Sequence, residues 1–219
     1  MLVNVNNIDL YYKKTGSGDP LILLHGNSED SNIFNKITVK LKDYFTVYAI
    51  DSRNHGKSGK SKDYKYEYMA SDLKAFIEEL ELDKPNILGF SDGAILSLML
   101  SISDGNLINK QALLGPSLTP EDLTDDGRRI IEKFIQRYNT DILRMILTDP
   151  HIELAELKKI TVPTLIVGAE NDIIKPEVFK NMVETISNSQ FLLVKGHSHE
   201  TYIVDNDMLF EELLKFFKG

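Results

Sequence analysis

The stretch Pro85-Asn86-Ile87-Leu88-Gly89-Phe90-Ser91-Asp92-Gly93-Ala94 decides how this chain folds. Its first half is apolar, as in a strand that is covered on both faces, and the residues after it, up to Ser103, are apolar nearly all round, as in a buried helix. Gly89 and Gly93 flank Ser91 at a spacing of two, where small residues let strand and helix approach closely. The stretch therefore predicts a tight strand–turn–helix unit that exposes a strained serine hydroxyl.

Outward from this unit, short β-rich runs alternate with longer amphipathic ones, a pattern typical of parallel βαβ units. An antiparallel hairpin around Asn6-Asn7 opens the chain. Helices are expected at Tyr68–Leu82, Ala94–Ser103 and Leu209–Phe217. The eight predicted strands are Leu2–Val5, Ile8–Lys14, Leu21–Leu24, Phe45–Ile50, Ile87–Phe90, Gln111–Leu114, Thr164–Val167 and Phe191–Val194.

One segment interrupts this alternation. Residues 118–160 are charged and helical in pattern and contain no convincing strand, although strands are predicted on both sides. We interpret them as a small helical cap inserted into a core formed by residues 1–117 and 161–219.

The Gly89-x-Ser91-x-Gly93 pattern, with a strand before it and a helix after it, resembles the nucleophile elbow of the α/β-hydrolase superfamily, and the likeness extends over nearly the whole chain. It implies an α/β fold, with a mostly parallel eight-stranded sheet flanked by helices and a small helical cap insertion. It also implies that Ser91 is a nucleophile. The alternative is a Gly-Ser-Gly turn without chemistry.

The resemblance places the other two catalytic residues after later strands, in the order serine, acid, histidine. Asp172, which precedes an Ile–Pro loop, is the expected acid, with Glu170 as the alternative. His197 directly follows a glycine and is the expected base, with His199 as the alternative. A His-x-His metal pair is disfavoured because no further ligand cluster lies nearby in the sequence.

The resemblance also assigns two loops. The pair His25-Gly26 implies an oxyanion loop in which the backbone N–H groups of Asn27 and Asp92 are the donors and His25 is structural. The loop from Asp51 to Ser58 matches an architectural motif of the family. Its Gly-Lys-Ser triplet is not a phosphate-binding loop, because position 51 is Asp and no helix follows.

Two features concern the substrate. Asp92 places a carboxylate beside the nucleophile, either to favour a substrate with a cationic group, such as an amino-acid ester, or only as a helix N-terminal charge. The cap would supply acyl-chain contacts, unless its apolar residues merely attach it to the core. The candidate substrate contacts are Asp92, Phe134, Tyr138 and Met145.

The bulk composition narrows the class of protein. A formal net charge of −8 argues against a nucleic-acid partner, and the absence of cysteine excludes thiolate nucleophiles and disulfides. The N-terminus shows no signal peptide and no apolar run approaches the length of a membrane span, so we expect a cytoplasmic protein. Neither a metal nor another cofactor is expected, and the partner is a small-molecule substrate.

These features predict a serine hydrolase that cleaves carboxylic ester bonds, or amide or thioester bonds, of a small substrate. A dehalogenase or epoxide hydrolase of this fold would need Asp at position 91. Two alternatives remain: a ligand-binding protein that keeps the fold without catalysis, and a metal-dependent hydrolase.

Overall fold

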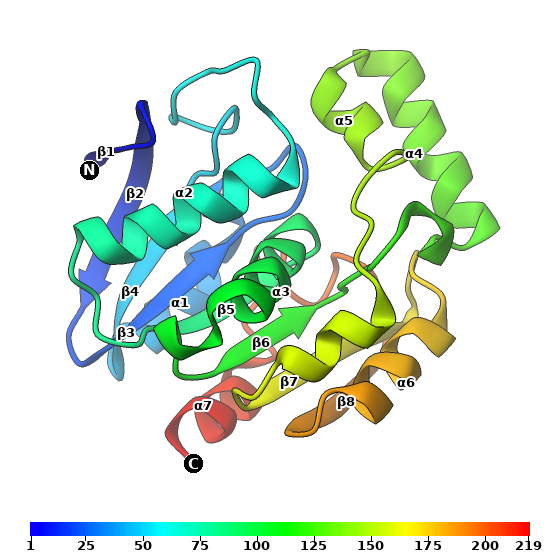
Figure 1. Cartoon of the computed structure of the whole chain (residues 1–219). Helices are drawn as coiled ribbons and strands as arrows, with labels where there is room; N and C mark the ends of the chain where they lie inside the picture. Colours follow the sequence, from blue (N-terminus) through cyan, green and yellow to red (C-terminus); the bar gives the residue numbers. More distant parts are fainter.

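The computed structural model describes residues 1–219 and contains one eight-stranded sheet in the order β1-β2-β4-β3-β5-β6-β7-β8 (Figure 1). Strand β2 pairs antiparallel with β1 and with β4, and the six strands β4, β3, β5, β6, β7 and β8 run parallel to one another. The predicted α/β class and all eight predicted strands are confirmed. The strands are β1 Leu2–Val5, β2 Ile8–Gly16, β3 Asp19–Leu24, β4 Phe45–Ile50, β5 Asn86–Phe90, β6 Gln111–Leu114, β7 Thr164–Asn171 and β8 Ser189–Ser198.

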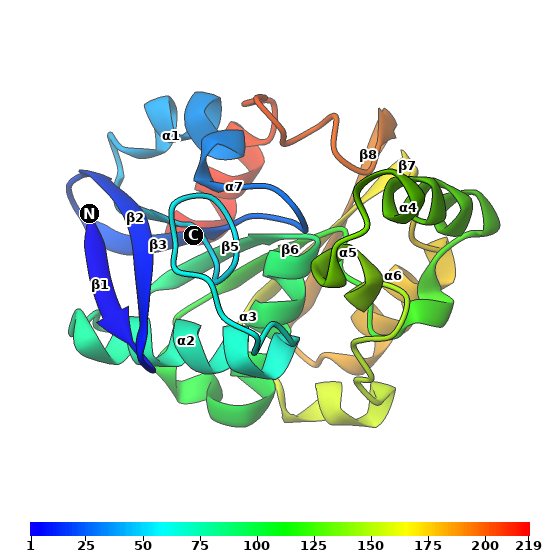
Figure 2. The ribbon, with the colours of Figure 1, turned by 90° about the horizontal axis from the view of Figure 1, so that it is seen from above.

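Helices cover both faces of this sheet (Figure 2). Helices α1 and α7 lie on one face, and α2, α3 and α6 lie on the other. The α-helices are α1 Asn35–Leu41, α2 Tyr66–Glu79, α3 Asp92–Asp104, α4 Asp125–Tyr138, α5 Asp141–Met145, α6 Pro176–Thr185 and α7 Phe210–Lys218. The 3-10 turns are η1 Ser31–Phe34, η2 Gly105–Leu107, η3 Pro120–Asp122 and η4 Leu154–Lys159.

The last two strands are longer than their apolar runs predicted. β7 and β8 continue to pair beyond Gly168↔Leu193, through Ala169↔Val194 to Asn171↔Ser198, with a register shift between Ala169 and Asn171. β8 is an edge strand whose residues are mostly half-buried or exposed, so its polar end carries no hydrophobic signal. The extension moves the end of β8 from Val194, as predicted, to Ser198. The first histidine beyond the strand is therefore His199 and not His197.

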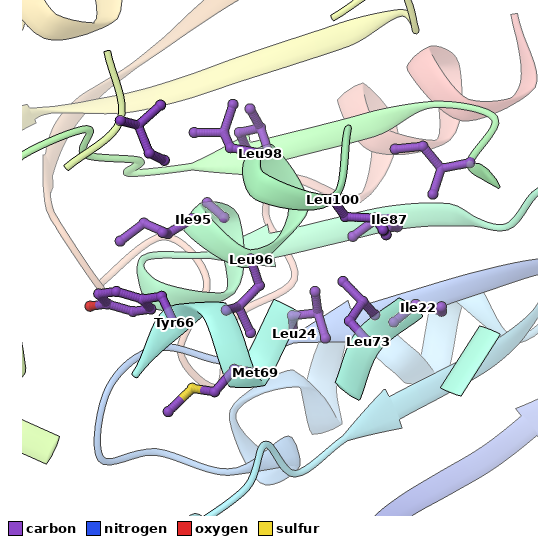
Figure 3. Packing of buried hydrophobic residues seen from close by; sticks show 14 of the residues in the cluster. Ile22, Leu24, Tyr66, Met69, Leu73, Ile87, Ile95, Leu96, Leu98 and Leu100 are labelled. Atoms are coloured by element: carbon purple, nitrogen blue, oxygen red, sulfur yellow. The ribbon is translucent and has the colours of Figure 1, made fainter. Parts of the chain in front are cut away.

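The core between the sheet and its helices explains why the α3 sequence is apolar nearly all round. Figure 3 shows the α3 side chains Ile95, Leu96, Leu98 and Leu100 in one cluster with Ile22 and Ile87 of the strands and Met69 and Leu73 of α2. Because α3 is covered by the sheet on one side and by α2 on the other, it has almost no polar face. This packing holds the N-terminus of α3, and therefore Ser91, rigidly against the sheet.

The chain between β6 and β7 contains η3, α4, α5 and η4 and no strand. Helices α4 and α5 lie beyond the carboxyl ends of the parallel strands (Figure 1). By contrast, η4 packs against α3 and α6, with Leu157 and Ile160 fully buried. No helix of the protein is both long and apolar enough to cross a membrane.

Candidate active site

Ser91 occupies the turn between β5 and α3 in a strained conformation, with φ 51° and ψ −115°. The turn is tight: a Cβ added to Gly89 would lie 2.3 Å from the carbonyl oxygen of Gly93, and one added to Gly93 would lie 2.2 Å from the carbonyl oxygen of Leu24. Only glycine fits at either position. The backbone of Ser91 is fixed further because its N–H donates to the Leu114 carbonyl at 2.8 Å.

The hydroxyl of Ser91 lies in line with a histidine and a carboxylate. His199 Nε2 is 3.1 Å from Ser91 Oγ, and its Nδ1 is 2.6 Å from Asp172 Oδ1. Since an ionised carboxylate only accepts, Nδ1 donates to Asp172, and Nε2 is left with a lone pair that faces the serine hydroxyl. The geometry suits removal of the hydroxyl proton by His199. Each of the three residues immediately follows its strand, at β5, β7 and β8.

Asp172 is held as an anion despite its burial. Its side chain is 1% exposed, which by itself would raise its pKa. The hydrogen bond and charge of His199, together with the N–H groups of Ala169 at 3.0 Å and Ile174 at 3.1 Å, outweigh burial and bring the pKa of Asp172 below its ordinary value. The carboxylate is therefore charged at neutral pH and fixes the orientation of the imidazole.

The choice of His197 as the base was wrong. His197 still lies within β8, and its Nδ1 is 3.0 Å from Thr201 Oγ1, away from the serine. The rule that the base follows the last strand was sound, but the strand ends at Ser198 and the first residue beyond it is His199. The alternative acid, Glu170, accepts from the Gly196 N–H at 2.8 Å and does not contact His199.

The loop after β3 lies beside Ser91. The backbone N–H groups of Asn27 and Asp92 have no acceptor within the protein, as is usual for the first N–H of a helix such as α3. His25 supports this loop: its Nε2 accepts from the Ser52 N–H at 3.0 Å, and its Nδ1 donates to the Gly26 carbonyl at 2.7 Å. Burial lowers the pKa of His25 to about 4, so the ring is neutral and structural, as predicted.

The loop after β4 is architectural, as the sequence indicated. Asp51 accepts from the N–H groups of Ser31 and Lys57, both at 2.8 Å, and its carbonyl accepts from Ser58 Oγ. These bonds join the loops after β3 and β4 and leave no open cradle of N–H groups for a phosphate.

A cavity of about 470 Å³ opens above Ser91 and His199. Its walls are largely apolar, and its titratable side chains include His199 and four acidic residues but neither Lys nor Arg. Of the four candidate substrate contacts, Asp92 and Phe134 line it. Tyr138 and Met145 do not: Tyr138 stacks on the Phe134 ring at the exposed side of α4, and Met145 is buried in the core. The apolar residues lining the cavity are Phe90, Ile95, Leu123, Ile130, Ile131, Phe134, Leu143, Ile146, Ile173 and Ile174.

Two residues of the site were not predicted. Glu29 lines the cavity, its Oε2 accepts from the Gly26 N–H at 2.9 Å, and burial raises its pKa to about 7. Gly115 follows β6 with φ +59°, and a Cβ there would lie 2.5 Å from Cε1 of His199. The Leu114-Gly115-Pro116 sequence marks a turn, but nothing in it shows which ring that turn must accommodate.

The structure contains no group of three or more His, Asp or Glu side chains arranged to bind a metal ion. The two histidines of the His-x-His sequence have separate partners, because His199 contacts Asp172 and Ser91 while His197 contacts Thr201.

Comparisons with known proteins show which family the chain belongs to. The model of the α/β-hydrolase fold family matches residues 19–144. Human serine hydrolase BPHL is 25% identical over 92% of this chain and 80% of its own length. The "Probable alcohol acetyltransferase" of Wickerhamomyces anomalus is 28% identical over 58% of this chain, which spans only 36% of that protein.

Among solved structures, the esterase EaEST from Exiguobacterium antarcticum superimposes with a TM-score of 0.86 at 22% identity, covering 100% of this chain and 98% of the esterase. At this identity the likeness establishes the fold alone. Taken with the family match over more than half of the sequence, it shows that the chain belongs to the α/β-hydrolase fold family.

Proposed function

We propose that this protein is a serine hydrolase that cleaves carboxylic esters of a small substrate through an acyl-enzyme on Ser91. The observation that carries the proposal is the continuous relay from Ser91 Oγ through His199 to Asp172, at 3.1 and 2.6 Å, which opens into an apolar cavity. A protein that only binds a ligand has no need for a buried carboxylate aligned behind a histidine and a strained serine. The similarity of this chain to a human serine hydrolase supports the same proposal.

In the proposed reaction, Ser91 Oγ attacks the ester carbonyl while His199 Nε2 takes the hydroxyl proton. Asp172 keeps Nδ1 protonated and stabilises the imidazolium. The N–H groups of Asn27 and Asp92 bind the oxyanion, each contributing about 3 kcal/mol of transition-state stabilisation. His199 then protonates the departing alcohol, and water, activated by the same nitrogen, releases the acid from Ser91.

The cavity favours substrates without a negative charge. The acidic side chains of Glu29, Asp92 and Glu200 line it, with Glu29 only partly ionised at neutral pH because its pKa is about 7, and neither Lys nor Arg lines it. We therefore propose neutral or cationic esters as substrates, among them amino-acid esters. If Asp92 acts through its charge, Asp92→Asn will lower the preference for cationic over neutral acyl groups; an equal preference in both proteins contradicts that role.

The proposed cap is the segment of residues 118–160, of which α4 and α5 lie over the site. Helix α4 contributes Ile130, Ile131 and Phe134 to the cavity wall, and α5 and the residue after it contribute Leu143 and Ile146. Because only part of this wall comes from the cap, acyl-chain selection depends on a few side chains. Phe134→Ala is expected to lower the ratio of butyrate to acetate turnover by about threefold, which is less than an enclosed methylene is worth because Phe134 is 46% exposed.

The direct test is reaction with a fluorophosphonate probe, followed by peptide mass spectrometry, in parallel with turnover of p-nitrophenyl acetate and butyrate. We expect an adduct on Ser91, loss of turnover in proportion to labelling, and neither in Ser91→Ala. A folded protein that shows neither labelling nor turnover would contradict the proposal and favour a ligand-binding role. Turnover that is abolished by a chelator and insensitive to the probe would favour a metal-dependent hydrolase.

A further inference from the structure

The side chain of Asp92 forms hydrogen bonds with two different parts of the protein. Its Oδ1 accepts from the Tyr66 hydroxyl at 2.8 Å, at the start of α2, and its Oδ2 accepts from Asn27 Nδ2 at 2.9 Å, in the loop after β3. Asp92 is only 6% exposed and forms no salt bridge with Lys or Arg. Burial raises its pKa, while the hydrogen bonds from Tyr66 and Asn27 act in the opposite direction.

Asn27 extends this connection to α5. Its Nδ2 also donates to the Ile142 carbonyl at 3.0 Å, while its Oδ1 accepts from Ser28 Oγ. Both hydrogens of the amide are thus used, one toward the elbow and one toward α5. Every other hydrogen bond formed by residues 141–145 is to a residue within five positions, so this is the only hydrogen bond that joins α5 to the sheet domain, beside the apolar packing of Met145 in the core.

Tyr66, Asp92, Asn27 and Ile142 therefore form one chain of hydrogen bonds across four segments. Asn27 is also the residue whose backbone N–H is the proposed oxyanion donor. Its side chain is held between Asp92 and the Ile142 carbonyl, and a fixed side-chain rotamer restricts the backbone torsion angles that place the N–H.

We propose that Asp92 is a positioning residue whose carboxylate fixes Asn27, so that docking of α5 and placement of the Asn27 oxyanion donor are coupled. This deepens the proposed function and rests on it for the role of the Asn27 N–H. The hydrogen bond that attaches α5 can be tested without any catalytic assay.

The test is a double-mutant cycle of Asp92→Ala, Asn27→Ala and the pair, with two readouts. Hydrogen exchange of the peptide covering residues 141–148 reports docking of α5, and kcat and KM for p-nitrophenyl acetate report the oxyanion site. Each single variant is expected to speed exchange in that peptide about tenfold and to lower kcat about tenfold, with KM within about twofold. Because either substitution breaks the same chain of hydrogen bonds, the double variant should lose no more exchange protection and no more kcat than the more affected single variant.

Asp92→Asn is the conservative comparison. Its amide oxygen can accept from Asn27 while its nitrogen donates to the Tyr66 oxygen, so it should recover most of the exchange protection that Asp92→Ala loses and have a kcat at least about fivefold higher than Asp92→Ala. The matched control is Asp126→Ala, which removes an exposed carboxylate from the first turn of α4.

Additive effects in the double variant would overturn the proposal, as would unchanged exchange in residues 141–148 of Asp92→Ala. If either alanine variant fails to fold, exchange in Asp92→Asn and Tyr66→Phe decides, since both keep an acceptor for Asn27 and should keep α5 protected. Wild-type protein with α5 protected but no Ser91 labelling would leave the docking role standing and contradict the proposed function instead.

Discussion

The turn after β5 and the loop after β8 each place one residue of the proposed relay, but they do so by different means. The turn is enclosed: Gly93 lies against the Leu24 backbone, and no larger residue fits. The start of the loop, residues 199–201, is half-buried or exposed, and Gly196 in β8 just before it has nothing within 4 Å of an added Cβ. Ser91 is therefore fixed by its own local sequence, whereas His199 is fixed by the residues it contacts, Asp172 and Gly115.

The largest expected effect tests the partner that fixes His199. Asp172→Asn keeps the shape of the acid but presents an amide that can donate to Nδ1 and favour the wrong tautomer. We expect kcat for p-nitrophenyl acetate to fall by about 10³- to 10⁴-fold with KM little changed. Glu170→Gln is the control and should stay within about twofold. Similar losses in both variants would contradict the assignment of Asp172.

A pair of glycine substitutions compares the two regions directly. Gly93→Ala would force a Cβ to within 2.2 Å of backbone, so we expect a loss of more than about 3 kcal/mol in the free energy of unfolding, or no folded protein. Gly196→Ala meets only the strain of φ +74° and should cost about 1 kcal/mol. Urea denaturation measures both. Equal losses in the free energy of unfolding for the two variants would contradict the difference between the turn after β5 and the loop after β8.

Gly115→Ala tests whether the histidine is placed by the space left for it. The new methyl group would lie 2.5 Å from His199 Cε1 and must displace the ring from Ser91. We expect kcat to fall by about 10- to 100-fold, because small misplacements of a reacting group cost this much. A crystal structure of the variant should show the imidazole moved. Wild-type kcat with an unmoved ring would contradict this role.

The smallest expected effect concerns Glu29 and the pH dependence of stability. Because its pKa is about 7 in the folded protein against 4.5 ordinarily, Glu29 takes up a proton on folding between these pH values, so its contribution to stability falls as pH rises from about 4.5 to 7. In Glu29→Gln the amide oxygen can still accept from the Gly26 N–H, and the variant has no titratable group at this position, so the contribution of this residue to stability does not fall over this pH range. Relative to wild type, its Tm should be a few degrees higher at pH 8 than at pH 5. A constant difference would contradict the raised pKa.

The same contrast explains what could be predicted from sequence. All eight strands follow from apolar runs and turn residues, whereas the roles of Ser91 and Asp172 follow from the resemblance to the α/β-hydrolase superfamily. The end of β8 could not be located, because an edge strand with polar residues at its end has no apolar pattern to mark it. That four-residue difference led to His197 instead of His199. The carboxylates lining the cavity, such as Glu29, were equally hidden, since their burial depends on the way separate loops meet.

The most direct test of the relay is to compare His199→Ala with His197→Ala. The two variants remove the same group two residues apart, and only His199 contacts Ser91 and Asp172. We expect His199→Ala to lower both kcat for p-nitrophenyl acetate and the rate of fluorophosphonate labelling at Ser91 by about 10³-fold or more, and His197→Ala to stay within about threefold of wild type. Loss of activity in His197→Ala, with His199→Ala active, would contradict the relay.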